Sequence, residues 1–375
     1  TVMDEHKSLR DTKLYVDLGK FKSNINSIRK LIGDRSRIMA VLKANAYGHG
    51  LAELVKPAVL AGVSYIGVAT LKEAITVREC DESVPILILG YTPEHLFDAV
   101  VENNITQTIF DLDSAKKLDQ VSSMKNRKTK VHIKIDTGLH RLGFSDTYQS
   151  LEDILAISKM ESLNTEGIFS HLALTDDESN EIQFARFNYF VQALEERGCD
   201  FKIKHIADSI ATVDYPKYRL DMVRVGALIY GIRGFHKGNV DVELISSLKT
   251  KIAQIHQISK GEGVSYDYTW KAERPSIIGT IPIGYGDGIP RHLSNKGYAS
   301  IDGWKCPYVG LINMDYAMID LTEVPDISRT YKEKDVIIYD GSDSTMDISD
   351  IAKITGTNKN DILCRITPRV ERIYF

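Results

Sequence analysis

Short apolar runs that read as strands alternate with amphipathic helical segments through the first two thirds of the chain. We expect strands at residues 38–42, 65–69, 85–89, 106–110, 130–135, 167–170, 202–206 and 222–225. Helical periodicity fills the intervals, for example at residues 114–121, 151–160 and 181–197. Eight such units within about 200 residues predict a (β/α)8 barrel of the TIM type. A doubly wound open sheet is the alternative, but it suits fewer strands, and no Gly-rich first turn for a dinucleotide is present.

The pattern changes near residue 245. Strand-like runs at 248–258, 276–283, 299–301 and 336–339 are separated by Gly, Asp and Pro, and one convincing helix remains, at 348–354. We therefore predict an α/β protein with a barrel at residues 12–245 and a mainly β domain at residues 246–375. A strand at 13–17 precedes the first barrel helix and fits either domain.

Composition excludes several classes of protein. The 375 residues are 43% hydrophobic and 26% charged, as in an ordinary globular protein. A net charge of −4 offers no basic footprint, so nucleic acid is not an expected partner. Four dispersed cysteines without a CxxC pair predict no disulfide framework and no metal site, and indicate a reducing compartment. No apolar run reaches the roughly 18 residues of a membrane span, and no signal peptide is visible.

Polar side chains gather where the expected barrel strands end, which is the face that carries the active site in such barrels. A single lysine at a strand end, such as Lys43, would usually be exposed. A ring of cations on one face is hard to explain as packing, because isolated charges are costly to bury. The side chains in this ring are Lys43, Lys134, Asp136, Arg141, His171, His205, Ser209 and Arg224.

This ring suits one kind of chemistry. A lysine held among apolar strands and other cations should have a lowered pKa, so that it can attack a carbonyl and form a Schiff base. Pyridoxal phosphate (PLP) needs such a lysine, a partner for its ring nitrogen and a cradle for its phosphate. Ser209 and the backbone amides near Gly226 could supply the cradle.

Seven segments resemble the motifs of the alanine racemases, the fold type III PLP enzymes. In the barrel they are AVLKANAYGHG at 40–50, HIKIDTGLHRLGF at 132–144, HIADS at 205–209 and RVGALIYG at 224–231. In the second domain they are VSYDYTW at 264–270, PIGYGDG at 282–288 and NMDY at 313–316. The matches occur in order from about residue 12 to the C-terminus, so the resemblance covers nearly the whole chain.

The resemblance implies that Lys43 carries PLP and acts as one of two catalytic bases. Tyr266, supplied by the second subunit of a homodimer, would be the other base, although a tyrosine at the rim of a strand is the structural alternative. Two bases are required because inversion at Cα removes a proton from one face and returns a proton to the other.

The resemblance also implies contacts with cofactor and substrate, which is a free amino acid. Arg224 would face the pyridine nitrogen and, because arginine keeps its proton, would leave that nitrogen unprotonated and suppress transamination. A salt bridge with Asp221 is its structural alternative. Arg141 would orient the substrate carboxylate, and Lys134 matches a lysine that is often carbamylated. The other implied contacts are with the cofactor for Tyr47, His171, His205, Ser209, Gly226 and Tyr285, and with the substrate for Met314 and Asp315.

The chain departs from the family pattern at Asp208, Asp267, Leu311 and Asn313, and most of all at Asn360. Alanine racemases usually carry a tyrosine there, near the substrate side chain. Asn is smaller, and its amide can both donate and accept, so a pocket for a methyl group could admit a hydroxymethyl group. A surface Asn in the turn-like segment TNKN is the structural alternative.

The Asn360 substitution resembles the VanT-type serine racemases of glycopeptide-resistance clusters. This resemblance implies racemisation of serine and alanine, with D-Ser entering peptidoglycan precursors that vancomycin binds poorly. Such enzymes join a transmembrane domain to a cytoplasmic racemase domain, and a chain that begins at Thr1 fits a detached cytoplasmic domain of a bacterial membrane protein. An ordinary biosynthetic alanine racemase is the nearest alternative. This chain has no convincing match to the motifs of the fold-related PLP decarboxylases. Non-catalytic PLP-binding regulatory proteins usually consist of a barrel alone, so the predicted second domain argues against that class.

Overall fold

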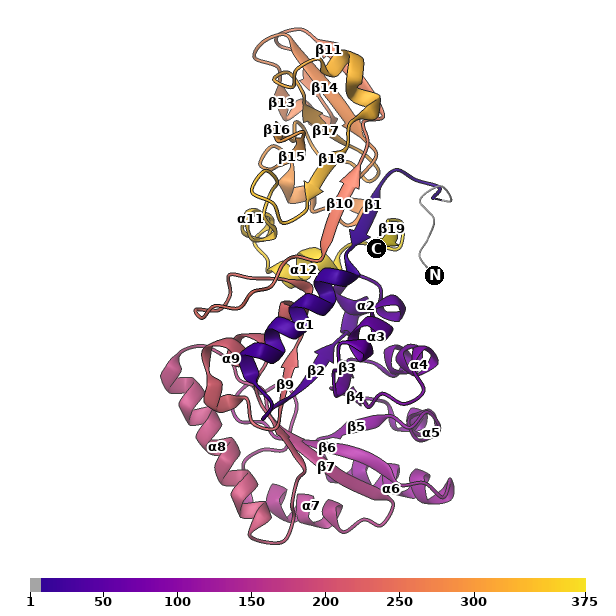
Figure 1. Cartoon of the computed structure of the whole chain (residues 1–375), viewed down its shortest axis with the longest axis vertical. Helices are drawn as coiled ribbons and strands as arrows, with labels where there is room; N and C mark the ends of the chain where they lie inside the picture. Colours follow the sequence, from indigo (N-terminus) through magenta and orange to yellow (C-terminus); the bar gives the residue numbers. More distant parts are fainter. Residues whose placement is uncertain (1–7) are drawn as a thin grey trace.

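The computed structural model describes residues 8–375, with a barrel and a smaller β domain stacked along the long axis of the molecule (Figure 1). Eight parallel strands form the barrel sheet in the order β8-β7-β6-β5-β4-β3-β2-β9. The sheet closes where the amides of Asp221 and Arg224 donate to the carbonyls of Lys204 (3.1 Å) and Ala207 (3.0 Å). The predicted barrel is therefore confirmed. Its strands are β2 (Arg37–Val41), β3 (Tyr65–Val68), β4 (Ile86–Ile88), β5 (Thr106–Ile109), β6 (Thr129–Lys134), β7 (Leu163–Phe169), β8 (Ile203–His205) and β9 (Met222–Val225).

Helices surround the barrel, and several of them begin at a side-chain cap. Asp17 accepts a hydrogen bond from the amide of Lys20 at the start of the first helix, and Thr70 and Glu73 form a capping box at the start of α4. The segments between strands are α1 (Leu18–Ile32), α2 (Lys43–Tyr47), α3 (Leu51–Leu60), α4 (Leu71–Cys80), α5 (Phe97–Glu102), α6 (Leu112–Met124), α7 (Tyr148–Ser158), α8 (Asp177–Glu195) and α9 (Ser209–Asp214).

Every barrel strand overlaps the range predicted for it, and the largest difference is at β7. This strand begins at Leu163 rather than at residue 167. Residues Asn164 to Glu166, near the start of this strand, are polar and only partly buried. Hydrophobic periodicity alone therefore does not detect them.

The second domain is mainly β, as predicted. A six-stranded sheet has the order β16-β15-β18-β10-β1-β19, and a three-stranded sheet has the order β11-β14-β17. The first strand of the chain, β1, pairs with β10 and β19 and so belongs to this domain. The strands are β1 (Lys13–Val16), β10 (Ser246–Thr250), β11 (Gln254–Ile258), β12 (Gly263–Val264), β13 (Trp270–Lys271), β14 (Ser276–Ile281), β15 (Tyr298–Ile301), β16 (Trp304–Pro307), β17 (Ala317–Asp320), β18 (Val336–Tyr339) and β19 (Glu371–Tyr374).

Two predictions for this domain were wrong. The run at 248–258 is two strands, because β10 pairs with β1 and β18 whereas β11 pairs with β14 in another sheet. The region also contains more than one helix: α10 (Ile327–Thr330) and α12 (Lys359–Cys364) accompany α11 (Ile348–Thr355). The turn-like segment before α12 is its cap, since the side chain of Asn358 accepts from the amide of Asp361 at 3.0 Å.

No helix within residues 8–375 is long and apolar enough to cross a membrane. All four cysteines are free thiols. The same described residues contain no group of three or more His, Cys, Asp or Glu side chains that could hold a metal ion.

Candidate active site

A cavity of about 600 Å³ lies where the C-terminal ends of the barrel strands meet α11 and α12 of the second domain. This is the face on which the sequence places its ring of polar residues. Nine of the predicted site residues line the cavity: Lys43, Tyr47, Lys134, Arg141, His171, Ser209, Arg224, Gly226 and Asn360. A cavity of this size, with convergent polar groups, is a candidate ligand site.

Lys43 follows β2 and begins a turn of unusual hand. Residues Ala44, Asn45, Ala46 and Tyr47 have φ angles of 52°, 54°, 52° and 53°. Left-handed helical backbone costs roughly 1–2 kcal/mol per residue for L-amino acids other than glycine. The turn brings both Lys43 and Tyr47 to the wall of one cavity, and strained backbone of this kind is often found at functional sites.

Contacts from distant parts of the chain hold this turn. The carboxylate of Glu73 accepts from the amide of Ala44 at 2.8 Å. The guanidinium of Arg372, in β19, donates to the carbonyl of Gly48 through Nε (3.0 Å) and Nη2 (2.9 Å). Both charged partners bond to backbone groups, and such charge-assisted bonds are stronger than neutral ones. The sequence did not identify Glu73 or Arg372 as parts of the site.

Arg224 is buried, and its guanidinium is surrounded by acceptors. Nη1 lies 2.9 Å from Nδ1 of His205. Nη2 lies 3.1 Å from Nδ1 of His171 and donates to the carbonyls of Ser170 (2.8 Å) and Ile206 (3.1 Å). The salt bridge with Asp221, offered as a structural alternative, was wrong: among the described residues the Asp221 carboxylate instead accepts from the amide of Lys204 at 2.8 Å.

A line of hydrogen bonds continues from Arg224 through the barrel core, and we call it the histidine chain (Arg224, His205, His132 and Glu166). Nε2 of His205 lies 2.9 Å from Nδ1 of His132, and Nε2 of His132 lies 3.4 Å from the Glu166 carboxylate. Tyr65 also donates to this carboxylate, and Lys130 lies 3.0 Å from it. The three donors hold the pKa of Glu166 at about 2, although burial opposes this shift.

The two ends of the histidine chain set the tautomers of both histidines. A guanidinium can only donate, and an ionised carboxylate can only accept. His205 must therefore accept at Nδ1 and donate from Nε2, and His132 must do the same toward Glu166. Burial lowers the pKa of both histidines, which keeps each of them neutral with one proton for one donated bond.

The sequence analysis missed His132 and Glu166. A signal for His132 was present, because it lies two residues before Lys134 and so on the same face of β6. Gly167, opposite it on β7, is required by its ring: a Cβ there would lie 2.7 Å from two atoms of the His132 side chain. Phe169 was also missed; it stacks on the His205 ring at 4.6 Å, and the Arg224 guanidinium lies over it at 5.3 Å.

The cavity is lined by several cations, and burial together with their charge lowers the pKa of its two lysines. Burial lowers the pKa of Lys43, and the nearby charges of Arg141 and Arg224 lower it further. Burial and the charge of Arg224 lower the pKa of Lys134 to about 7, from an ordinary value of 10.5. Burial and the surrounding cations lower the pKa of His171 to about 2. An amine with a lowered pKa is a better nucleophile near neutral pH, and the fixed positive charge favours an anionic ligand.

The ends of β8 and β9 form a cradle suited to a phosphate. The Ser209 hydroxyl lies 3.2 Å from the amide of Gly226 and 3.4 Å from that of Leu228. Gly226 leaves room for Tyr47, since a Cβ there would lie 2.3 Å from the Tyr47 hydroxyl oxygen. Both amides donate to the Ser209 oxygen, so the O–H of Ser209 stays available, and a hydroxyl that lines a cationic cavity can donate to a phosphate. Together with Lys43 and Arg224, these groups fit PLP.

The second domain closes the cavity with α11 and α12. Asn360 lies in α12 rather than in a turn, and it lines the cavity although it is exposed in this chain. Asp208, one of the departures from the family pattern, also lines the cavity. It caps α9 by accepting from the amide of Ala211 at 2.9 Å, and burial raises its pKa.

The structure does not bring all predicted residues to this cavity. Tyr266, Tyr285 and Met314 are 68%, 41% and 53% exposed, and within the described chain none of them lines it. Asp315 pairs with Arg369 at 2.6 Å. His205 lies behind Arg224 and Phe169 in the barrel core rather than at the cavity wall.

Comparisons with known proteins cover both domains. Residues 16–234 match the alanine racemase N-terminal domain, and residues 245–374 match the alanine racemase C-terminal domain. The chain is 39% identical to alanine racemase 2 of Caldanaerobacter subterraneus subsp. tengcongensis, over 98% of this chain and 95% of that protein.

Solved structures agree with this match. An alanine racemase structure from Clostridium difficile 630 has a TM-score of 0.93 and 33% identity, with 98% of this chain and 97% of that chain covered. An alanine racemase structure from Bartonella henselae, with covalently bound pyridoxal phosphate, has a TM-score of 0.87 and 26% identity, with 97% and 99% covered.

Proposed function

Because the chain belongs to the alanine racemase family, whose enzymes depend on PLP, we propose that it interconverts L- and D-alanine with PLP held by Lys43. One observation carries the proposal: Lys43, Arg224 and the phosphate cradle of Tyr47, Ser209 and Gly226 line a single cavity. Lys43 would supply the amine, Arg224 the partner of the ring nitrogen, and the cradle the phosphate site. Racemisation by the purified holoenzyme, followed by circular dichroism of L-alanine solutions, tests it.

When bound, PLP withdraws electrons from the substrate and so makes the proton on Cα easier to remove. The neutral amine of Lys43 can accept that proton on one face, because its pKa is lowered. Arg224 lines the cavity, where it would face the cofactor as a donor, and it would keep its proton there. The histidine chain holds Arg224 in one orientation from behind, since His205 presents an unprotonated nitrogen to it.

The second base is Tyr266, contributed by the partner in a homodimer. Its side chain is 68% exposed and lies outside the cavity of its own chain, which is what a residue delivered to a neighbouring subunit requires. Tyr285 and Met314 share this placement. Tyr266→Phe should keep PLP but lose racemisation, because phenylalanine has no acidic proton to return. Full activity of this variant would exclude the tyrosine as a base.

Arg141 and Lys134 form the carboxylate end of the site. Both line the cavity, and the pKa of Lys134, lowered to about 7, leaves much of its amine unprotonated at neutral pH. An unprotonated amine can add carbon dioxide to form a carbamate. The carbamate would place a negative charge beside Arg141 and so hold that guanidinium toward the substrate carboxylate.

A serine racemase is the second candidate, and Asn360 is the observation that favours it. This residue lines the cavity in place of the larger tyrosine and offers an amide that can bond a hydroxyl. A pocket that merely tolerates a hydroxyl discriminates by roughly a hundredfold at most, so mixed serine and alanine activity is expected. A role in vancomycin resistance, like that of the VanT-type enzymes, rests on this residue alone, and the names of the relatives favour an ordinary alanine racemase.

The two candidates separate in one measurement. We expect kcat/KM for L-alanine to exceed that for L-serine, and Asn360→Tyr to lower the serine-to-alanine ratio further. An unchanged ratio in Asn360→Tyr would show that Asn360 is not the determinant. Comparable or higher activity on serine in the parent enzyme would make the serine racemase the better description.

A further inference from the structure

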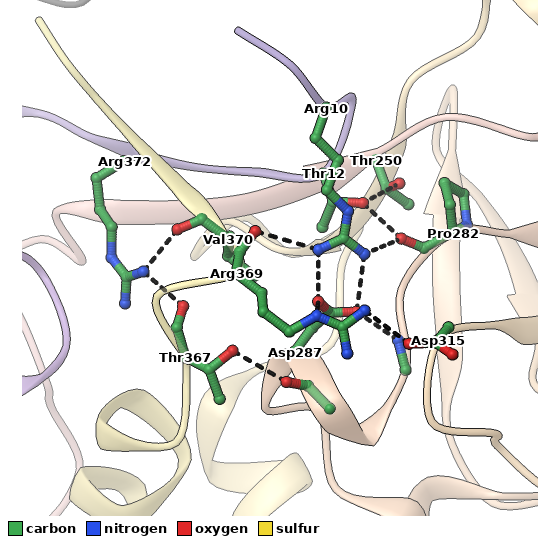
Figure 2. A network of polar contacts seen from close by, with 12 residues as sticks. Arg10, Thr12, Thr250, Pro282, Asp287, Asp315, Thr367, Arg369, Val370 and Arg372 are labelled. Atoms are coloured by element: carbon green, nitrogen blue, oxygen red, sulfur yellow. Dashed lines mark hydrogen bonds and ion pairs between the residues drawn. The ribbon is translucent and has the colours of Figure 1, made fainter.

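A network of arginines and carboxylates joins the two surface loops that carry Tyr285 and Met314 (Figure 2). At its centre is Asp287, whose side chain is completely buried. Arg10 donates to both carboxylate oxygens of Asp287, at 2.5 and 2.9 Å. The amide of Gly284 donates to it at 2.9 Å. Asp287 is therefore a fixed point to which the first described residues of the chain and the 284–288 loop are both bound.

The two loops are also bonded to each other through their backbones. The amide of Tyr285 donates to the carbonyl of Asn313 at 3.0 Å, and the amide of Gly286 donates to the carbonyl of Met314 at 2.9 Å. These two bonds place Tyr285 and Met314 side by side. No large apolar core lies between them, since both side chains are exposed.

Arg369 bridges the two loops. Its Nη2 pairs with Asp315 of one loop at 2.6 Å, and its Nε lies 3.5 Å from Asp287 of the other. The guanidinium passes directly over Gly286, where a Cβ would lie 2.3 Å from Nη1 of Arg369. A side chain at residue 286 would therefore meet the tip of Arg369 and displace it. Only a planar guanidinium with several donors can reach both carboxylates at once, and lysine cannot replace it.

Stability alone does not account for this bridge. Asp315 and Arg369 have side chains that are 51% and 44% exposed, and an exposed ion pair contributes little to the stability of a protein. Arg10 already satisfies both oxygens of the buried Asp287. What Arg369 adds is a fixed spacing between the loops.

We propose that Arg369 is a positioning residue that sets the Tyr285 and Met314 loops for the active site of the partner subunit. The proposal rests on the proposed function, in which these loops complete a site shared across a homodimer. Arg369 touches neither substrate nor cofactor in this scheme. It acts through Asp315 and Asp287, which hold the two loops, and the loops in turn contact the substrate and the cofactor.

The first test compares Arg369→Gln and Arg369→Lys with Arg365→Gln. Arg365 is a matched control in the same segment, because within residues 8–375 its side chain pairs with Asp361, one helical turn earlier. Both Arg369 variants should raise KM for L-alanine about tenfold or more with kcat within about threefold, since misplaced binding groups weaken binding of the substrate and transition state alike. The control should match the parent. An unchanged KM in Arg369→Gln would overturn the proposal.

Mixed dimers test whether the arginine acts across the interface. Pairing an Arg369→Gln subunit with a Lys43→Ala subunit leaves one cavity with its lysine. That cavity receives its loops from the Lys43→Ala subunit, in which Arg369 is intact. KM in the mixed dimer should therefore return to the parent value, and a KM that stays raised would overturn action in trans.

Hydrogen exchange gives a readout that does not depend on activity. The amides of Tyr285 and Gly286 should exchange faster in Arg369→Gln holoenzyme than in the parent, and at the parent rate in Arg365→Gln. Equal exchange in all three proteins would overturn the proposal that Arg369 holds the two loops in place. Failure of the proposed function is distinguishable, because it appears as a parent enzyme that does not racemise alanine, whatever the exchange rates are.

Discussion

Glu166→Gln tests the anchor of the histidine chain. The variant keeps the size of the side chain and one acceptor oxygen but removes the negative charge that faces His132, Tyr65 and Lys130. The Glu166 side chain is 12% exposed, so solvent screens these contacts only weakly. We expect the variant to fold, because the barrel strands on either side of it are unchanged, but to be measurably less stable.

The magnitude follows from the pKa of Glu166, which falls from an ordinary value of 4.5 to about 2 in the folded protein. At about 1.36 kcal/mol per pKa unit, this difference of about 2.5 units corresponds to about 3 kcal/mol of stability at neutral pH. The sign is that of a carboxylate whose pKa is lowered by folding. The stabilisation is complete above the unfolded pKa of 4.5 and is lost as the pH falls toward about 2.

The assay is urea unfolding of the holoenzymes, followed by far-ultraviolet circular dichroism at several pH values. Tryptophan fluorescence is unsuitable, because Trp270 and Trp304 both lie in the second domain, whereas most helices surround the barrel. Glu152→Gln is the control, since Glu152 pairs with Arg197 at the surface and such pairs contribute about 0–1 kcal/mol.

We expect Glu166→Gln to lose about 3 kcal/mol at pH 7 and about 2 kcal/mol near pH 3.5, with little change in the control. A loss below about 1 kcal/mol at pH 7 that does not vary with pH would refute the argument, because an uncharged side chain would then serve as well.

Three further changes probe the cavity. Gly226→Ala puts a Cβ 2.3 Å from the Tyr47 hydroxyl, so the dissociation constant of PLP, measured by equilibrium dialysis, should rise about tenfold or more; an unchanged constant would contradict the cradle. Arg372→Gln loses charge-assisted bonds to the Gly48 carbonyl, so hydrogen exchange in residues 43–50 should accelerate; parent-like protection would mean that other contacts hold the turn. In ¹³C-bicarbonate, a carbamate resonance should grow as the pH rises through about 7, where Lys134 loses its proton, and it should be absent in Lys134→Arg; a signal that persists in that variant belongs to another amine.

Elements whose residues interact locally could be predicted from the chain alone. Each barrel strand carries its own apolar run, so periodicity located all eight. The start of β7 and the α12 helix were missed because polar residues such as Glu166 and Asn358 also suit turns and caps. Their assignment depends on what lies beside them in space.

Some residues of the candidate site could likewise be predicted from the sequence, and others could not. Lys43, Arg224 and Ser209 end separate strands, and parallel strands in a barrel bring their C-terminal ends together, so their convergence was predictable. His132 and Glu166 were not predicted as a pair, because β6 and β7 must be in register before their side chains meet. Exposed Tyr266 was assigned by resemblance, since no local pattern tells an interface tyrosine from a surface one.

By itself, the sequence determined the barrel, the second β domain and the identity of the residues at the strand ends. Tertiary structure decided the left-handed turn after Lys43, the tautomers of the histidine chain and the bridge that Arg369 forms between two loops. The physical reason is distance along the chain. Periodicity and capping act over a few residues, whereas Arg372 reaches a carbonyl 324 residues away and Arg10 binds a carboxylate 277 residues away. Such contacts exist only after segments far apart in the sequence have been brought together by folding.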